Sequence, residues 1–173
     1  MTRTIETRRL RLRPICASDA ETIYETWARD SEVTRYLTWQ PHENVEVTRA
    51  VVDTWVAAYD REDTFRWGIE RKEDGVLMGM IDMVGYRDGA PVIGYCSGRA
   101  FWNNGYMTAA LGAVTAELFS AGFDRISMEA VAENIGSNRV IQKAGFRFLG
   151  VRPAEVFEGK PWIKQINRYE LCK

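Results

Sequence analysis

The stretch from residue 93 to residue 118 combines residue types that could bind an anion. It begins with an apolar segment at 93–96, passes through Asn103, Asn104 and Gly105, and continues with apolar residues three or four positions apart: Met107, Ala110, Leu111, Val114 and Leu118. This spacing predicts one face of an α-helix. The first backbone N–H groups of a helix lack partners and carry partial positive charge. Gly105 lets a ligand approach the backbone, and the asparagines tolerate left-handed conformations. We therefore predict an anion site formed by a strand, a polar loop and a helix start.

The same stretch disfavours two familiar kinds of phosphate site. It carries no Lys or Ser/Thr in a Walker A frame and no GxGxxG pattern, so neither a nucleoside triphosphate nor a dinucleotide is indicated. An ordinary β-loop-α corner without a ligand remains the alternative interpretation.

A second polar stretch, at residues 134–146, is a helix with a cap-rich start and a glycine at its end. Either Asn134 or Ser137 could cap the helix, and Gly145 ends it. A structural role alone would explain these residues.

The two stretches together resemble the GNAT acetyltransferases, and specifically the branch of the RimJ/RimL ribosomal-protein N-acetyltransferases. The first stretch matches that branch at Ile93-Gly94-Tyr95 and at Trp102-Asn103-Asn104-Gly105-Tyr106-Met107-Thr108-Ala109-Ala110. The second matches its N-x-x-S-N and K-x-G-F patterns at Asn134, Ser137, Asn138, Lys143, Gly145 and Phe146. The chain departs from the branch at Asn103, where a Gly is common, and at Met107, where a small residue is usual.

The resemblance implies a protein that binds acetyl-CoA as co-substrate and needs no metal. The residues that it implies for the cofactor are Cys96, Ser97, Trp102, Asn103, Asn104, Gly105, Tyr106, Met107, Thr108, Asn134, Asn138 and Lys143. In relatives the Asn at the position of Asn134 contacts the pantetheine arm. Ser137 occupies the position near the sulfur, where a hydroxyl would protonate the departing thiolate.

Acetyl transfer to an amine also needs a base for the amine proton and a donor that polarises the thioester carbonyl. The backbone N–H of Cys96 or of a neighbour is the candidate donor. Relatives carry acids at the positions of Val92 and Ala109, so the base must be another carboxylate. The remaining acidic candidates are Glu155, Asp82, Glu129 and Glu133. Glu155 is the first choice because its segment, 153–159, resembles the one before the last strand where ribosomal-protein acetyltransferases carry an acidic residue that faces the acceptor. A solvated loop carboxylate explains Glu155 equally well.

The acceptor pocket is expected at Arg35, Tyr36 and Trp39, together with Trp102, because aromatic side chains favour a cation and the stem of an amine. Packing at a helix break is the alternative role of Tyr36 and Trp39. Cys96 is expected to be a buried small apolar residue rather than a nucleophile. Direct transfer in a ternary complex is therefore expected, without a covalent acetyl-enzyme.

Composition indicates an ordinary globular protein. The 173 residues carry a formal net charge of −1, with 46% hydrophobic and 27% charged residues. No basic excess points to nucleic acid, and no apolar run reaches the ~18 residues of a membrane span. Three cysteines and a single histidine show no metal-ligand spacing. We expect one cytoplasmic domain over residues 1–173, and relatives that pair suggest a homodimer.

The elements expected along the chain are strands and helices in an α+β order. Strands are predicted at 5–13, 64–70, 76–85, 92–97, 125–131, 146–152 and 162–171, and helices after a capping box at 18–21, near 31–37, at 43–61, at 106–121 and at 134–144. One twisted, mixed sheet of about six or seven strands follows from this order. It also matches the GNAT fold.

The leading hypothesis is an N-acetyltransferase that acts on the N-terminal α-amine of a protein or peptide. A small amine, such as a polyamine or an antibiotic, is the alternative acceptor. A non-catalytic CoA-binding module is the alternative from another class, favoured by the missing acids at Val92 and Ala109.

Overall fold

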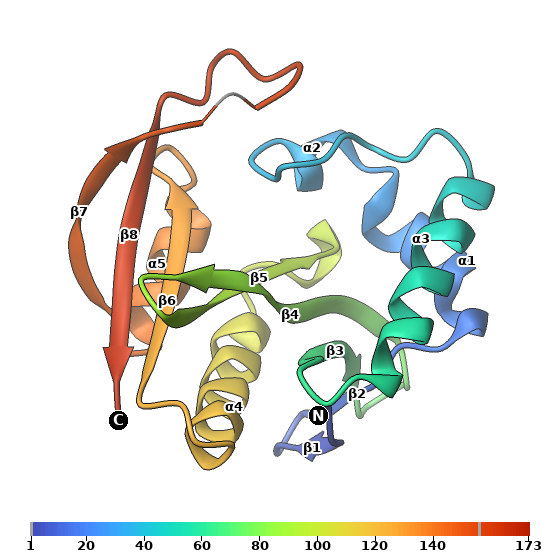
Figure 1. Ribbon diagram of the computed structural model, residues 1–173. Helices are drawn as coiled ribbons and strands as arrows, with labels where there is room; N and C mark the ends of the chain where they lie inside the picture. The colour runs from blue at the N-terminus through green and yellow to red at the C-terminus, as the bar shows by residue number, and fades with distance from the viewer. Residues whose placement is uncertain (1, 156) are drawn as a thin grey trace. The chain divides into compact units, whose positions relative to one another are not determined.

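The computed structural model describes residues 2–155 and 157–173 (Figure 1). Its strands are β1 (Ile5–Glu6), β2 (Leu10–Arg13), β3 (Arg66–Arg71), β4 (Leu77–Arg87), β5 (Ala90–Ser97), β6 (Arg125–Val131), β7 (Arg147–Pro153) and β8 (Gln165–Cys172). Its helices are α1 (Ala20–Ile23), α2 (Ser31–Thr34), α3 (Val45–Ala57), α4 (Tyr106–Ser120) and α5 (Ile135–Lys143). A π-helical segment, Tyr24–Ala28, continues α1.

The eight strands of the described residues form one mixed sheet in the order β1-β2-β3-β4-β5-β6-β8-β7. Strand β5 runs parallel to β6, with Val92 opposite Ser127. Strand β8 runs antiparallel to both β6 and β7. The mixed sheet and its helices confirm the predicted α+β class.

The sheet exceeds the predicted strand number because residues 5–13, expected as one strand, form two. The backbone N–H of Thr7 donates to the carbonyl of Leu10 (2.9 Å), and its hydroxyl accepts from the Leu10 N–H (3.0 Å). The chain therefore turns back, and β1 pairs antiparallel with β2, with Ile5 opposite Leu12. Alternation of apolar and polar residues continues through this turn, so the pattern alone does not locate it.

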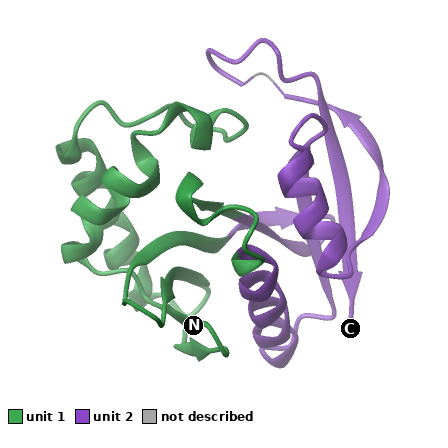
Figure 2. Ribbon diagram, turned by 180° about the vertical axis from the view of Figure 1, so that it is seen from behind, with its two compact units in different colours: residues 1–82, 95–106 green, residues 83–94, 107–173 purple. Residues whose placement is uncertain are grey.

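The first compact unit comprises residues 1–82 and 95–106 (green in Figure 2). Side chains from several of its elements form one apolar cluster: Ile15, Ala20, Ile23, Trp27, Ala28, Val33, Val52, Leu77, Met80 and Cys96. Leu37, Trp39 and Trp55 pack against the edge of this cluster. The cluster holds the helical segment after β2 against β4 and the end of β5.

The predicted capping box at residues 18–21 is wrong. The first turn is a 3-10 helix, Ala17–Asp19, and the backbone N–H of Cys16 donates to Oδ2 of Asp19 (2.9 Å). Arg13 donates to both carboxylate oxygens of Asp19 (2.8 and 2.9 Å), which holds the carboxylate at this turn. The acidic residue that accepts a backbone hydrogen bond at the start of this helical segment is therefore Asp19, not Glu21.

Hydrophobic spacing within residues 43–61 predicts a buried face of Val47, Val51, Trp55 and Ala58, but helix α3 buries a different face. The buried residues are Thr48 and Val52, whereas the face of Val47, Val51, Trp55 and Ala58 is only partly covered or exposed. Nδ1 of His42 lies 2.8 Å from the Thr48 hydroxyl. A polar side chain with such a partner can be buried at little cost, and hydrophobic spacing does not reveal that partner.

The second compact unit comprises residues 83–94 and 107–173 (purple in Figure 2). Helix α4 buries the predicted residues Ala110, Leu111, Val114 and Leu118, whereas Met107 is half-buried. Positive φ angles at Gly122 (99°) and Gly145 (91°) follow α4 and α5, as expected for glycines that end helices.

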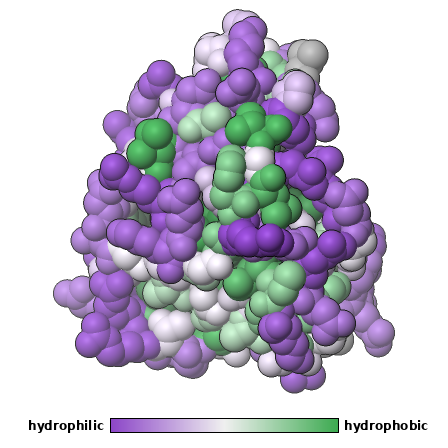
Figure 3. Space-filling model, turned by 90° about the vertical axis from the view of Figure 1, so that its left-hand side faces the viewer, coloured by the Kyte–Doolittle hydropathy of each residue, from purple (hydrophilic) through white to green (hydrophobic). Residues whose placement is uncertain are grey.

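Exposed apolar surface occurs on the edge strand β7, at Phe148, Leu149 and Val151. Figure 3 shows the side on which β7 lies in Figure 1, where hydrophilic side chains separate the apolar areas. Among the helices that the structure describes, none combines the length and the apolar character needed to cross a membrane.

Candidate functional site

The loop between β5 and α4 is held in a curled conformation by its own polar groups. Nε1 of Trp102 donates to the carbonyl of Ser97 (2.9 Å), and Nδ2 of Asn104 donates to the carbonyl of Trp102 (2.8 Å). Asn103 and Gly105 have positive φ angles of 60° and 73°. Trp102, which precedes Asn103, is extended (φ −67°, ψ 158°). Left-handed conformations, which the residue types of the loop are expected to tolerate, therefore occur at Asn103 and Gly105.

An arginine from the turn before β2 lies against this loop. Nη2 of Arg9 donates to the carbonyl of Asn104 (3.0 Å), and its guanidinium carbon lies 4.5 Å from the centre of the Tyr106 ring. A Cβ placed on Gly105 would lie 3.5 Å from Nη2. Alternation of apolar and polar residues over 5–13 predicts that Arg9 lies on the polar face of a strand, and only the fold brings it to the loop.

A second arginine, Arg71 at the end of β3, flanks the other part of the loop. Its guanidinium carbon lies 5.2 Å from the centre of the Phe101 ring, and its Nε donates to Asp74 (3.0 Å). Asp74 and, next, the Tyr106 hydroxyl raise the pKa of Arg71. Arg9 and Arg71 thus place two guanidinium groups beside the loop, and Asp74 pairs with the second of them.

Two glycines set the position of the end of β5. A Cβ on Gly79 would lie 2.4 Å from the carbonyl oxygen of Cys96, and one on Gly98 would lie 2.7 Å from the carbonyl oxygen of Thr26. The backbone N–H of Gly98 donates to the carbonyl of Met78 (2.9 Å). Only glycine allows these close approaches.

Cys96 lies within this tightly packed segment and is buried. Burial and, next, the charge of Asp82 raise the pKa of its thiol. A thiol with a raised pKa carries little thiolate at neutral pH and is a poor nucleophile. Cys96 therefore acts as a small apolar residue.

In the second unit, Asn134 is the cap of α5, and its side chain accepts a hydrogen bond from the Ser137 N–H (3.2 Å). Asn138 is buried. Its Nδ2 donates to the carbonyls of Asn134 (2.7 Å) and Val131 (3.0 Å), and its Oδ1 accepts from the Tyr169 hydroxyl (2.6 Å). These partners use the whole amide, so any effect of Asn138 on a cofactor would come through the turn that it holds. Lys143 is exposed in the last turn of the helix.

The residues expected at the acceptor site follow α2. Arg35 is exposed and lies over the ring of Tyr36, with 5.4 Å between the guanidinium carbon and the ring centre. Trp39 is half-buried, and its ring centre lies 5.3 Å from that of His42. Trp39 also packs against the apolar cluster that contains Cys96. Trp39, one of the residues predicted for the acceptor site, therefore packs against the same cluster as Cys96 at the end of β5.

The carboxylates proposed as bases lie in different environments. The Glu155 side chain is 77% exposed, and its Oε1 lies 3.6 Å from Arg152 and 4.0 Å from Arg87. Glu133 is exposed. The Asp82 side chain is 11% exposed and forms an ion pair with Arg66.

Glu129 borders a charged cavity of about 150 Å³ in the second unit. Arg152 donates to both of its oxygens (3.2 and 2.7 Å), and Nε of Arg87 lies 2.8 Å from Oε1 without the alignment of a hydrogen bond. Asp88 at the rim of the cavity pairs with Arg168 (2.9 Å). The charges of this cavity largely neutralise one another.

The predicted site residues fall into two groups, one in each unit. The first unit holds Arg35, Tyr36, Trp39, Cys96, Ser97, Trp102, Asn103, Asn104, Gly105 and Tyr106, and the second holds Met107, Thr108, Asn134, Ser137, Asn138, Lys143 and Glu155. Met107 and Thr108 belong to the first turn of α4, directly after the loop. Within the described residues, no group of three His, Cys, Asp or Glu side chains is placed to hold a metal ion.

Comparison with known proteins points to one family. A family model described as an acetyltransferase (GNAT) domain matches residues 9–147. The uncharacterized N-acetyltransferase YoaA of Bacillus subtilis strain 168 is 34% identical over 173 residues, covering 98% of this chain and 96% of that protein.

Solved structures share the fold. The RimL ribosomal L7/L12 α-N-protein acetyltransferase, in complex with coenzyme A, has a TM-score of 0.85 at 21% identity, with 98% of each chain covered. The microcin C7 self-immunity acetyltransferase MccE, in complex with acetyl-CoA and AMP, has a TM-score of 0.83 at 19% identity, with 96% of this chain and 94% of that chain covered. The family match spans β2 to the start of β7, including the curled loop and the capped turn of α5. The chain belongs to the GNAT acetyltransferase family.

Proposed function

We propose that this protein transfers the acetyl group of acetyl-CoA directly to a primary amine, and that the amine is the N-terminal α-amine of a protein or peptide. The observation that carries the proposal is the curled loop with left-handed Asn103 and Gly105, which precedes α4 and lies beside Arg9. The loop offers backbone donors and positive charge without a side-chain nucleophile.

The residues present fit the diphosphate of CoA. No Asp or Glu occurs between residues 97 and 106. Arg9 and Arg71 supply positive charge beside the loop. The N–H groups at the start of α4, which include those of Met107 and Thr108, would add the donors of a helix N-terminus. Charge-assisted hydrogen bonds of this kind are the stronger class in proteins.

Acetyl-CoA, when bound, supplies the thioester carbonyl that the amine attacks. The chain has to position the two reactants, because alignment alone contributes several kcal/mol to the rate. A backbone N–H at Cys96 or its neighbour would polarise the carbonyl. The Ser137 hydroxyl would donate a proton to the departing thiolate, and a carboxylate would accept the proton of the amine.

The choice of a protein or peptide acceptor is supported by resemblance in fold. RimL is named as an α-N-protein acetyltransferase of ribosomal L7/L12. The half-buried Trp39 and Tyr36, next to the exposed Arg35, could flank an extended N-terminus. A small amine would use the same aromatic residues, so the acceptor panel must contain both classes.

The test is to follow free thiol release from acetyl-CoA with a panel of N-terminal peptides, polyamines and aminoglycosides. A reaction without amine controls for hydrolysis. Turnover with peptides and little with small amines is the expected result. Turnover with small amines alone would favour the alternative acceptor, and CoA binding without turnover on any amine would favour a binding module.

A further inference from the structure

Asp82 lies on β4 directly opposite Arg66 on β3. Nε and Nη2 of Arg66 donate to the same oxygen of Asp82, Oδ2, at 3.0 and 2.9 Å. The guanidinium therefore favours the ionised carboxylate and holds it through one of its two oxygens.

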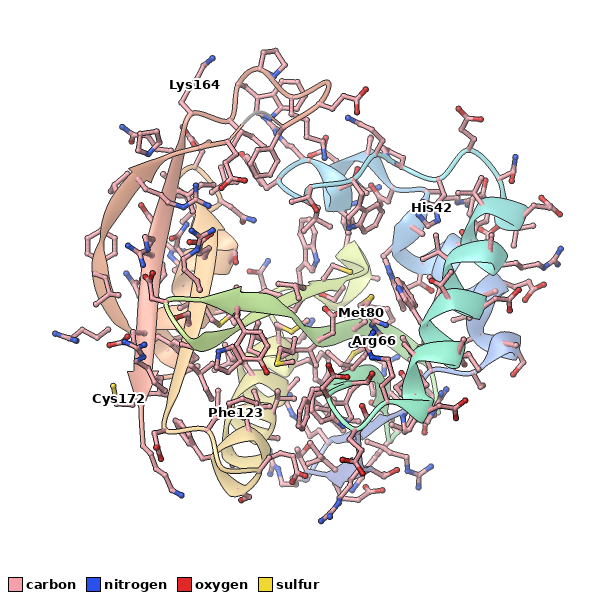
Figure 4. All side chains as sticks on the ribbon, in the orientation of Figure 1. His42, Arg66, Met80, Phe123, Lys164 and Cys172 are labelled. Atoms are coloured by element: carbon pink, nitrogen blue, oxygen red, sulfur yellow. The ribbon has the colours of Figure 1, made fainter. Side chains whose placement is uncertain are left out.

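The surroundings of this ion pair are aromatic and apolar. The guanidinium of Arg66 lies 5.2 Å from the ring centre of Trp55 on α3, and Figure 4 shows labelled Arg66 close to Met80 beside β4. Trp55 and Met80 belong to the apolar cluster and its edge, as does Trp39 of the expected acceptor site. The carboxylate thus borders the cluster that Trp39 also contacts.

Cys96 at the end of β5 belongs to the same apolar cluster as Met80, which lies two residues before Asp82 on β4. Side chains alternate along a strand, so Met80 and Asp82 project from the same face of β4. The charge of Asp82 also raises the pKa of the Cys96 thiol. Asp82 therefore brings a carboxylate to the buried end of β5.

The other carboxylates considered as bases are not both buried beside the apolar cluster and paired with a single arginine. Glu155 is largely solvated, and Glu129 is neutralised by Arg87 and Arg152. Burial raises the pKa of Asp82, and Arg66 opposes that shift. A base with a raised pKa accepts a proton from an ammonium group more readily than an ordinary carboxylate does.

We propose that Asp82 is the base that removes the proton of the acceptor amine, and that Arg66 is its positioning residue. The proposal rests on the proposed function. One N–H bond of the ammonium breaks, its electron pair stays on nitrogen, and an O–H bond forms at Oδ1 of Asp82. The neutral amine would then form a C–N bond to the acetyl carbon, and the C–S bond would break with its electron pair on sulfur. The second amine proton balances the proton that the departing thiolate takes up.

Three groups face Asp82 and would shape its titration: Arg66 from β3, Cys96 from β5 and Tyr59 from the 3-10 turn (Ala58–Asp60) after α3. Burial raises the pKa of Cys96 and of Tyr59 above their ordinary ranges, so both stay neutral when Asp82 ionises. kcat/KM should therefore rise with pH through the pKa of Asp82.

The experiment compares Asp82→Asn with Asp53→Asn, the same chemical change at an exposed position of α3. Measured quantities are kcat/KM against pH, acetyl-CoA affinity by calorimetry, and the rate with an acceptor whose amine is largely neutral at the assay pH. D82N should lose roughly 100-fold in kcat/KM, lose the ascending limb, and keep its acetyl-CoA affinity. The defect should shrink with the neutral acceptor. D53N should match the wild type.

A second variant keeps the carboxylate. Arg66→Gln removes the cation that favours ionisation, so the pKa of Asp82 should rise and the ascending limb should move to higher pH. The proposal would be overturned if the ascending limb of kcat/KM against pH did not move in R66Q. It would also be overturned if D82N kept this limb while Glu155→Gln lost it. A wild-type protein that binds acetyl-CoA but acetylates no amine would instead overturn the proposed function, and this inference with it.

Discussion

A guanidinium beside a loop of backbone donors increases the charge that the loop can neutralise. Nη2 of Arg9 donates a hydrogen bond to the Asn104 carbonyl. The other N–H groups of the guanidinium can therefore donate to a phosphate oxygen. Its packing on Tyr106 limits the side-chain entropy that binding would cost. Arg9 should therefore increase affinity for a dianionic ligand.

Arg9→Gln should weaken acetyl-CoA binding by roughly tenfold, which corresponds to about 1.4 kcal/mol. The matched control is Arg8→Gln, because Arg8 is its exposed neighbour and carries the same charge. Calorimetry at two salt concentrations is the measurement, and R9Q should also show a smaller loss of affinity on adding salt. Equal affinities of R9Q and R8Q would show that only net charge matters.

At the scale of elements, the approach of β4 to the end of β5 depends on a missing side chain. A Cβ on Gly79 would meet the backbone of Cys96 and Ser97 at 2.4 to 2.9 Å. Backbone cannot move aside as a flexible side chain can, so overpacking is costly here. The same segment carries the backbone donors proposed for the thioester.

Gly79→Ala should lower the free energy of unfolding by about 1–3 kcal/mol and reduce turnover. Gly112→Ala provides the contrast, since Gly112 lies within α4 and a Cβ there would meet nothing within 4 Å. G112A should stabilise the protein by about 0.5–1 kcal/mol through helix propensity. Urea denaturation measures both changes, and a neutral G79A would show that the strands can separate without cost.

The turn between β6 and α5 depends on Asn138 more than on the cap itself. Asn138→Ala would remove the acceptor of the buried Tyr169 hydroxyl and of the Asn167 side-chain amide, and the Val131 carbonyl would keep only its bond from the Asn134 N–H. Unsatisfied buried groups cost about 1–3 kcal/mol each, whereas loss of the Asn134 cap should cost about 1 kcal/mol. N138A should therefore be clearly less stable than N134A by urea denaturation. The reverse order would make the cap the dominant feature.

Elements with local signals follow from the sequence, and those that depend on distant partners do not. The stripe of α4 and the glycines after α4 and α5 carry signals within a few residues, and the structure confirms them. The turn at Thr7 and the face of α3 depend on hydrogen bonds to Leu10 and His42 that hydrophobic spacing does not encode.

For the whole molecule, the same distinction separates the cofactor loop from its surroundings. The loop residues are contiguous, so their types and spacing predict the anion site. Arg9 reaches Asn104 from 95 positions away, and Arg66 reaches Asp82 only through strand pairing. Charges of this kind become visible once the sheet register is known.

Direct transfer makes a prediction about the protein as a whole, since none of its cysteines should carry the acetyl group. Cys96 is buried with a raised thiol pKa, and Cys16 and Cys172 are exposed. Intact mass after incubation with acetyl-CoA alone should show no stable acetyl adduct, and labelled CoA should not exchange into acetyl-CoA without an amine. Initial-rate lines for the two substrates should intersect.

Exposed thiols can react slowly with a thioester by simple chemistry, so the control is the double variant Cys16→Ser with Cys172→Ser. An adduct that disappears in this variant reflects surface reactivity. An adduct on Cys96, together with exchange in the absence of amine and parallel initial-rate lines, would establish a covalent route. That outcome would require the buried thiol to lose its proton during the cycle, and Asp82 would then be the nearest charged group that opposes the thiolate.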